Sequence, residues 1–566
     1  MHGPESIQNP MAAIAIIFAL GISAQWLAWK FRVPSIILLL VFGFLGGPVT
    51  GLVKPDALLG DLLSPLVSLS VALILFEGGL SLRLAEVPGV QGVIFKLISV
   101  GMVVTWIVGA WAAHQFLDMS LSLSILLGAI LTVSGPTVII PLLRDIRPKA
   151  TLGSILKWEG ILIDPVGALC AVLVFEVIKE GDFLSAPIHI AYGVIMTAIV
   201  GGVVGFLGAT LLIFLIRNYL MPDYLQNPLS LSLVFIVHTV ADSVQPESGL
   251  FAVTLMGILL ANRSSITVKH IVEFKENLQV LLIGVLFILL SARLKLEYLD
   301  SLQFQSVIFL GVMVFVARPL AVIASTIGSG LSWRERLFLS WMAPRGIVAA
   351  AVSSLFSLEL SHAGVADADQ LVAFTFLVIV GAGFLYGLTS APVARFLKVQ
   401  QQDPQGVLFL GAHVIAREIA QRLKEEGFKV LLVDTNWGNV SASKLAGLPA
   451  HYGNILSENI VHDLDLNGIG RLFAMTPNDE ANSLAALRFT EHFGRANVYQ
   501  LPHDNSHPGD PEKLHPQHLR GRFLFGPDEH YFLLVEQMTA GARIKTINIT
   551  DEFSFEDVKA HYTALF

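Results

Sequence analysis

Charged residues are scarce in this sequence. Of its 566 residues, 14 % are charged, whereas a soluble domain usually carries about 25 %. The deficit lies in residues 11–397, which consist of apolar runs, while the chain after residue 399 has the charge content of a soluble protein. This uneven distribution predicts a transmembrane domain at 11–397, a water-exposed domain at 404–502, and a C-terminal extension at 503–566 to which no fold is assigned.

Cysteine and basic tracts are also lacking. Cys170 is the only cysteine, which excludes an intrachain disulfide and a cysteine-based metal site. The net charge is −8 and no long basic run occurs, so no nucleic-acid partner is expected. The first residues have neither the basic front nor the cleavage site of a signal peptide. The apolar run that begins at Met11 is therefore interpreted as a membrane helix that stays in the protein.

The apolar runs are long enough to cross a lipid bilayer, which takes about 20 helical residues. About thirteen spans are predicted, at 11–29, 35–53, 62–82, 93–117, 122–143, 154–178, 188–217, 229–242, 247–262, 271–291, 303–328, 333–360 and 369–397. Alternate connections hold about fifteen Lys and Arg residues and the others about four; such residues mark cytoplasmic loops. The predicted fold is an all-α polytopic domain in a bacterial-type plasma membrane, with the N-terminus outside and the C-terminal domain in the cytoplasm.

Two predicted spans contain helix-breaking residues near their middles. Gly135 and Pro136 interrupt the fifth span, and Pro344 and Gly346 interrupt the twelfth. The breaks lie seven spans apart, as expected of inverted repeats whose unwound helices cross. Unwinding at membrane depth is tolerated where the freed backbone groups line a cavity, and there their carbonyls can face a cation. The pattern favours a secondary transporter with alternating access.

Ionisable residues inside the spans need a reason, because a charge at the bilayer centre costs at least about 2.5 kcal/mol. Glu159 and Asp164 lie five residues apart on the sixth span, so they point about 140° apart on a helix. Arg345, at the second break, needs a carboxylate. We predict a structural ion pair of Glu159 with Arg345 and assign ion and proton binding to Asp164. The reverse assignment, in which Asp164 pairs with Arg345 and Glu159 binds the ion and the proton, stays open. Arg318 is interpreted as structural or helix-capping.

A carboxylate in a partly dry cavity can bind a proton near neutral pH, and a desolvated Na⁺ or K⁺ competes for the same oxygens. One group that binds either species, but never both, couples their exchange without a covalent step. The hydroxyls of Thr132, Ser134 and Thr137 are candidates to complete an oxygen shell, because hard cations take oxygen ligands. Glu77, late in the third span, is either a second cavity carboxylate or an interfacial residue beside Arg83.

Six stretches of the membrane region are distinctive in combination: FEGGL at Phe76–Leu80, SGPTVIIPLLR at Ser134–Arg144, KWEGILIDPVGAL at Lys157–Leu169, ESGLFAVTLMGILLAN at Glu247–Asn262, ARPLAV at Ala317–Val322 and APRGIVAAAVSS at Ala343–Ser354. Together they resemble the monovalent cation/proton antiporter family of the NhaP and sodium/hydrogen-exchanger type. The resemblance implies thirteen spans, crossed unwound helices and a homodimer. It also implies that Asp164 carries the ion, that Glu159 pairs with Arg345, and that Glu77 is the family's acidic residue on the third span.

The sequence departs from this family at two positions. The family's asparagine before the carrier aspartate is Ile163 here, and the aspartate of its Thr-Asp-Pro motif is Gly135. Fewer polar ligands remain, and only one carrier carboxylate is expected. The resemblance therefore implies electroneutral exchange of one cation for one proton, with Na⁺ favoured and K⁺ possible.

Residues 404–502 alternate apolar runs with an amphipathic segment. Strands are predicted at 406–411, 429–434, 472–476 and 497–501 and a helix at 414–426. This Rossmann-like pattern resembles the TrkA-N half of potassium-conductance regulatory (RCK) domains, which implies a possible nucleotide ligand at Gly411 and Asp434. The loop lacks two of the three glycines of G-x-G-x-x-G, and His413 stands at the second. Nucleotide binding and a structural or dimerising role both stay open.

Two other functions are weighed against antiport. An RCK-regulated potassium channel or efflux system would share the cytoplasmic domain, but a channel filter needs a carbonyl motif such as TVGYG, which this sequence lacks. A membrane-anchored dinucleotide oxidoreductase is disfavoured by the poor glycine loop and by the lack of a catalytic cluster. No enzymatic activity is expected, and no metal other than the transported cation.

Overall fold

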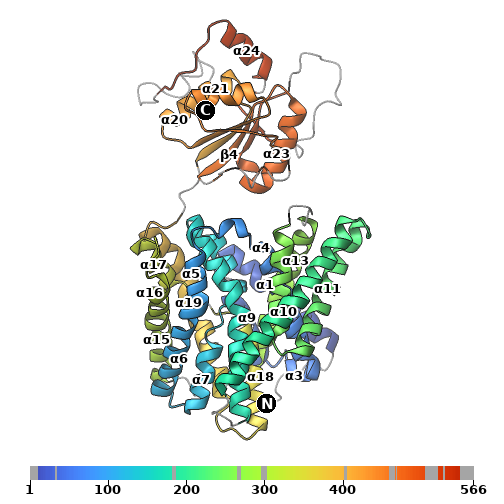
Figure 1. Ribbon diagram of the computed structural model, residues 1–566, viewed down its shortest axis with the longest axis vertical. Helices are drawn as coiled ribbons and strands as arrows, with labels where there is room; N and C mark the ends of the chain where they lie inside the picture. The colour runs from blue at the N-terminus through green and yellow to red at the C-terminus, as the bar shows by residue number, and fades with distance from the viewer. Residues whose placement is uncertain are drawn as a thin grey trace. The chain divides into compact units, whose positions relative to one another are not determined.

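The computed structural model describes residues 10–31, 33, 35–180, 186–263, 269–294, 303–343, 345–400, 405–457, 460, 464, 466, 468–503, 520–526 and 529–547. The chain divides into two units, Met1–Gln400 and Gln401–Phe566. The first is built of helices, and the second contains a parallel sheet (Figure 1). The division falls between α19 (Gln370–Phe396) and β1 (Gly406–Leu410).

Apolar helices fill the first unit. Within the described part of the chain, eight helical segments are long and apolar enough to cross a membrane, and five shorter ones are also apolar. The helices are α1 (Pro10–Phe31), α2 (Ser35–Phe44), α3 (Pro55–Leu59), α4 (Leu63–Ser81), α5 (Gln91–Lys96), α6 (Met102–Phe116), α7 (Leu121–Ile130), α8 (Pro136–Ile146), α9 (Ala150–Glu180), α10 (Ala186–Arg217), α11 (Asp223–Val244), α12 (Ser248–Ala261), α13 (Lys269–Ala292), α15 (Phe304–Val312), α16 (Arg318–Thr326), α17 (Trp333–Trp341), α18 (Ile347–His362) and α19. Each of the eight long and five shorter apolar segments overlaps one predicted span. The prediction of an all-α polytopic domain is therefore confirmed.

Glycines allow these helices to approach each other closely. A Cβ atom placed on Gly257 of α12 would lie 2.3 Å from the carbonyl oxygen of Phe76 on α4. One placed on Gly205 of α10 would lie 2.4 Å from the carbonyl oxygen of Ala252 on α12. Such contacts need small residues, because lipid supplies no hydrophobic force between helices and close packing must hold them together. Helices α4, α10 and α12 therefore form one tightly packed group.

Both spans that were predicted to break are interrupted. The fifth span consists of α7, which ends at Ile130, and α8, which begins at Pro136. The twelfth span consists of α17, which ends at Trp341, and α18, which begins at Ile347. Pro136 starts a helix readily because its missing N–H is not needed at the first helical position. Pro344, predicted to help break the twelfth span, lies outside the described residues.

Two neighbouring spans carry a π-helical turn, at Leu97–Gly101 between α5 and α6 and at Met313–Ala317 between α15 and α16. Turns of this kind are frequent at functional sites. The spans pack closely, since a Cβ atom on Gly101 would lie 3.0 Å from the hydroxyl oxygen of Ser325 on α16. Arg318 begins α16 directly after the second π turn.

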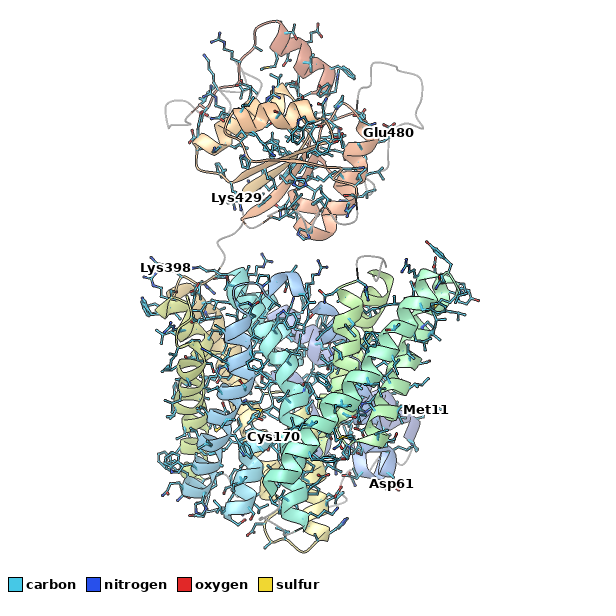
Figure 2. The ribbon with its side chains drawn as sticks, in the orientation of Figure 1. Met11, Asp61, Cys170, Lys398, Lys429 and Glu480 are labelled. Atoms are coloured by element: carbon cyan, nitrogen blue, oxygen red, sulfur yellow. The ribbon has the colours of Figure 1, made fainter. Side chains whose placement is uncertain are left out.

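The end of the membrane unit is tied to the loop before α9. The backbone N–H of Lys149 donates to the carbonyl oxygen of Val399 at 2.9 Å, and Pro148 pairs with Gln400 in an antiparallel bridge. Lys398, labelled in Figure 2, precedes this bridge with a φ of +56°. The chain that leaves α19 is thus fixed to the loop that starts the helix carrying Glu159 and Asp164.

Parallel strands form the sheet of the second unit. In its described part these are β1, β2 (Val430–Asp434), β3 (Ala450–Tyr452), β4 (Ile469–Ala474), β5 (Val498–Gln500) and β6 (Arg522–Phe523), accompanied by helices α20 (Val414–Glu425), α21 (Trp437–Leu445), α23 (Asp479–Phe493) and α24 (Tyr531–Thr539). The order is β3-β2-β1-β4-β5-β6, and Leu408 of β1 aligns with Leu431 and Leu472 on either side. This is the Rossmann order, as predicted. The order reverses between β1 and β4, where such folds bind ligands.

Part of the predicted C-terminal extension belongs to this α/β unit. β6 pairs with β5, and Leu534 of α24 is buried in the same apolar cluster as Ile415 and Ile419 of α20. β3 and β6 were not among the predicted strands, because Ala450–Tyr452 and Arg522–Phe523 form no apolar run.

Candidate functional site

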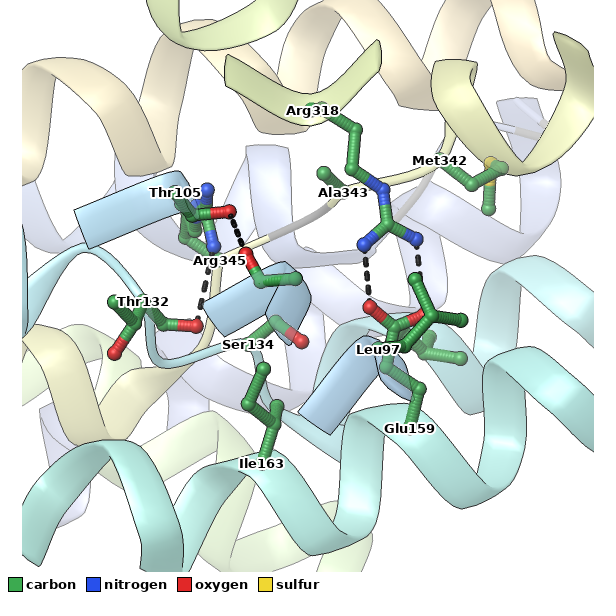
Figure 3. A pocket seen from close by; sticks show the side chains of 12 residues that line it. Leu97, Thr105, Thr132, Ser134, Glu159, Ile163, Arg318, Met342, Ala343 and Arg345 are labelled. Carbon is green, nitrogen blue, oxygen red and sulfur yellow. Dashed lines mark hydrogen bonds and ion pairs between the residues drawn. The ribbon is translucent and has the colours of Figure 1, made fainter. Parts of the chain in front are cut away.

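A small buried cavity lies where the two interrupted helices meet α9 (Figure 3). Its volume is about 10 Å³, close to the room that one water molecule needs. Its lining includes side chains from both breaks and from α9 and α16, among them Thr132, Ser134, Glu159, Ile163, Arg318 and Arg345. Segments far apart in the sequence thus bring polar and charged groups together inside the membrane unit.

Glu159 forms a two-point ion pair with Arg318. The Oε1 atom of Glu159 accepts from Nη1 of Arg318, and Oε2 accepts from Nη2 at 2.9 Å. The Nε atom of Arg318 donates to the carbonyl oxygen of Leu339 at 3.0 Å. Both side chains are buried, with 3 % of Glu159 and 7 % of Arg318 exposed. The pair therefore joins α9, α16 and α17, and both oxygens of Glu159 are occupied.

The prediction that Glu159 pairs with Arg345 is wrong, because the partner of Glu159 is Arg318. Arg345 is buried, and its Nη1 atom donates instead to the carbonyl oxygen of Thr132 at 3.3 Å. Among the described residues, no carboxylate lies within ion-pair distance of Arg345. The reason is local: Arg345 lies in the unwound segment between α17 and α18, where helical geometry does not predict side-chain direction, while Arg318 reaches the same cavity from the first position of α16.

Asp164 lies on the other side of α9 from this ion pair. It is 2 % exposed, and its Oδ1 atom is buried with no hydrogen-bond partner among the described residues. Gly160 and Gly167 stand one turn before and after it, on the same helix face. A Cβ atom placed on Gly160 would lie 2.4 Å from Cδ1 of Ile139, and one placed on Gly167 would lie 2.9 Å from Oγ1 of Thr132. Asp164 therefore faces the interrupted fifth span, although it is not among the residues that line the cavity of Figure 3.

The two hydroxyl residues predicted as ligands lie at the first break. Thr132 is 1 % exposed and donates from Oγ1 to the carbonyl oxygen of Ala129 at 2.7 Å. Ser134 is also buried and lines the cavity. Both residues line the cavity together with Glu159 and Ile163 of α9, and Oγ1 of Thr132 would lie 2.9 Å from a Cβ atom placed on Gly167 of the same helix. The side chain of Thr137 lies outside the described residues.

Glu77 contacts a residue of α13. With the amide of Gln279 turned so that its nitrogen faces the carboxylate, that nitrogen donates to both carboxylate oxygens of Glu77, at 2.6 and 3.1 Å. The next residue, Gly78, faces α9, because a Cβ atom there would lie 3.4 Å from Cγ1 of Ile161. Glu77 is therefore held between helices, one residue from the contact with the helix that carries Asp164.

The two breaks touch through glycine. A Cβ atom placed on Gly346 would lie 2.7 Å from both the nitrogen and the Cα atom of Gly135. Backbone therefore meets backbone at the crossing, and no side chain fits between the two segments.

We predict that Gly346→Ala destabilises the membrane unit. The added methyl group would force the two backbones apart, and overpacking of this kind costs about 1–3 kcal/mol. The thermal midpoint of the detergent-solubilised protein should fall, and the yield of folded protein with it. Gly311→Ala in α15 is the matched control, because nothing lies within 4 Å of its added Cβ atom. Equal midpoints for the two variants would contradict the crossing.

Sequence families agree with this architecture. The sodium/hydrogen exchanger transmembrane family matches residues 13–396, more than half of the chain. The chain belongs to the sodium/hydrogen exchanger family. This exchanger is therefore a multi-pass membrane transporter and not an enzyme. The TrkA-N domain family matches residues 407–514 of its second unit.

Relatives of this exchanger are themselves named as antiporters. The K(+)/H(+) antiporter NhaP of Alkalimonas amylolytica is 27 % identical over 411 residues, which cover 71 % of this chain and 69 % of the relative. The Na(+)/H(+) antiporter 1 of Methanocaldococcus jannaschii is 26 % identical over 375 residues, 64 % of this chain and 85 % of the relative. The solved structure of the sodium proton antiporter MjNhaP1 from that organism has a TM-score of 0.62 at 24 % identity, covering 68 % of this chain and 99 % of its own. The likeness shows that they share a fold.

The TrkA-N domain of this exchanger places Gly411 directly after β1 and Asp434 at the carboxyl end of β2. Gly411 has a φ of +104°, which favours glycine. Asp434 accepts hydrogen bonds from the N–H groups of Ala412 and Asn436, both at 2.8 Å, and from Nδ2 of Asn439 at 2.9 Å. The predicted ribose-binding carboxylate is thus engaged by its own chain, and these residues fit a dinucleotide poorly.

Sequence reasoning interpreted Arg318 of this exchanger as structural or helix-capping but did not identify it as the partner of Glu159. A signal was present, because an arginine inside an apolar span needs a carboxylate. With Arg318 and Arg345 both available to Glu159 and Asp164, the sequence alone could not decide the pairing. The π-helical turn directly before Arg318 has no sequence signature.

Proposed function

We propose that this protein exchanges a monovalent cation for a proton across the membrane, and that Asp164 binds the two in turn. The observation that carries the proposal is the contrast between the two acids of α9. Glu159 is fully paired with Arg318, whereas Asp164 is equally buried but has an unpartnered oxygen among the described residues. A buried carboxylate without a partner must hold a proton or a cation, because its bare charge is too costly away from water.

The surroundings of Asp164 supply further oxygens for a cation. Pro165 has no N–H, so the carbonyl oxygen of Ile161 lacks its usual helical donor. The hydroxyls of Thr132 and Ser134 lie close to the same helix, and hard cations prefer oxygen ligands. Glu77 on α4 is a second acid, one residue from a contact with α9. In this proposal the cation displaces the proton from Asp164, so Asp164 holds either the cation or the proton and never both.

The exchange is proposed to be electroneutral, with one cation for one proton. Glu159 keeps its charge balanced by Arg318 throughout the cycle, and Ile163 offers no second polar ligand beside Asp164. Na⁺ and K⁺ are both candidate substrates, since relatives are named for one or the other. The crossing of Gly135 and Gly346 is the proposed pivot at which access alternates between the two sides of the membrane.

The remaining features are proposed from the distribution of basic residues and from the family resemblance. The N-terminus lies outside, the α/β domain lies in the cytoplasm, and the protein forms a homodimer in a bacterial-type plasma membrane. Residues 404–502 form the RCK-like domain, and the described part of 503–566 completes its sheet and packs against it.

Proton flux in liposomes tests the proposed function. The purified full-length protein is reconstituted with an internal pH-sensitive dye, and NaCl or KCl is added outside. Cation-dependent proton efflux should be saturable, and its rate should not change when an ionophore collapses the membrane voltage. A voltage-dependent rate would refute electroneutrality, and flux without any cation dependence would refute exchange itself.

A further inference from the structure

The crevice at which Rossmann folds bind dinucleotides is crossed here by a side chain of the protein. In such folds the ligand lies between the carboxyl ends of the strands where the order reverses, in this case β1 and β4. His413 follows β1, and its Nε2–H donates to the carbonyl oxygen of Met475, just after β4, at 2.6 Å. The imidazole therefore bridges the two strands at the position where a pyrophosphate would approach the backbone.

The glycine loop is held shut by further contacts. Its Ala412 N–H points to Asp434 at 2.8 Å, and the Ala412 carbonyl oxygen accepts from Nη1 of Arg417 at 2.9 Å. Burial lowers the pKa of His413, so the imidazole is neutral near pH 7 and its single proton is committed to Met475. The groups that would meet a pyrophosphate and a ribose are thus already hydrogen-bonded within the chain.

Helix α24 places an aromatic ring against the same histidine. The ring of Tyr531 lies 5.0 Å from that of His413, with their planes at 89°, an edge-to-face contact that is favourable for aromatic pairs. The helix is anchored, because His530 caps its first turn through a hydrogen bond from the Leu533 N–H at 3.3 Å and Leu534 is buried. Tyr531 is therefore held over the crevice by an ordered element.

We propose that α24 is a built-in lid which, together with His413, occupies the dinucleotide crevice of the α/β domain in place of a ligand. The inference is independent of the transport proposal. A dinucleotide could enter only if the imidazole left Met475 and Tyr531 moved away. The apparent affinity is then reduced by the fraction of molecules in that open state. The family resemblance alone would suggest a nucleotide site, and the contacts of this chain argue against one that is open.

Fluorescence anisotropy of NADH tests the lid on the full-length protein in detergent. Wild-type protein should show no saturable binding up to about 1 mM, the weak end of specific affinities. A His413→Gly/Tyr531→Ala double variant removes both obstacles and should bind at least about tenfold more tightly than wild type. Glu536→Ala is the matched control, because Glu536 lies on the same helix but is exposed, and it should behave as wild type.

Two results would overturn the proposal. One is saturable micromolar binding of NADH to the wild-type protein, and the other is a folded double variant that binds no more tightly than wild type. Thermal melting establishes that the double variant is folded. If it is not, hydrogen exchange of the wild-type protein decides: NADH at about 1 mM should leave exchange in residues 411–417 and 529–539 unchanged, and altered exchange there refutes the lid.

Discussion

Asp164→Asn is expected to abolish cation–proton exchange without unfolding the protein. Asparagine has nearly the shape of aspartate but can neither release a proton nor supply the negative charge that a buried cation requires. The Oδ1 atom of Asp164 has no hydrogen-bond partner among the described residues, so the substitution breaks no bond there. The exchange rate in proteoliposomes should fall by about 100-fold or more, which corresponds to about 3 kcal/mol at 1.36 kcal/mol per tenfold.

A second carboxylate provides the control. Glu359, at the end of α18, pairs with Lys179 at 3.0 Å but is 39 % exposed, and exposed pairs contribute about 0–1 kcal/mol. Glu359→Gln should keep exchange within about twofold of wild type. Both variants should melt at the wild-type temperature. Exchange near the wild-type rate in Asp164→Asn would refute its assignment as the carrier.

The transmembrane architecture could be predicted because its causes are local. A bilayer demands runs of apolar residues, and a helix breaks where glycine and proline interrupt its hydrogen bonds, so the spans and the interruption at Gly135–Pro136 are readable in order along the chain. The contact of Gly346 with Gly135 depends on how two distant segments pack. The sequence shows two small residues but not that their backbones touch.

The ion pair could not be predicted for the same reason. Helical periodicity separates Glu159 from Asp164 on α9, which the structure bears out, but it says nothing of side chains on other helices. Arg345 lies in an unwound segment, and Arg318 directly follows a π-helical turn, so the 3.6-residue period does not predict the direction of either side chain. In the α/β domain, likewise, the poor glycine loop was visible in the sequence, but its closure by Tyr531 from more than a hundred residues away was not.

Breaking the Glu159–Arg318 pair is expected to have the largest effect on stability. Removal of one partner of a buried ion pair leaves the other charge buried and unpaired, which costs about 3–5 kcal/mol. Glu159→Leu and Arg318→Met should each lower the thermal midpoint and the folded yield strongly, and far more than Asp164→Asn does. Arg293→Met is the control, because Arg293 pairs with Asp56 at 3.0 Å where the aspartate is 66 % exposed.

The double variant Glu159→Leu/Arg318→Met should recover much of the lost stability, because replacing a whole buried ion pair by apolar side chains is often neutral. The carbonyl oxygen of Leu339, released by Arg318, still accepts from the Met342 N–H at 3.3 Å. Pairing Glu159→Leu with Arg345→Met should give no such recovery, since Arg345 bonds to a backbone carbonyl instead. Recovery with Arg345→Met rather than with Arg318→Met would show that the pair formed in the membrane is the one the sequence suggested.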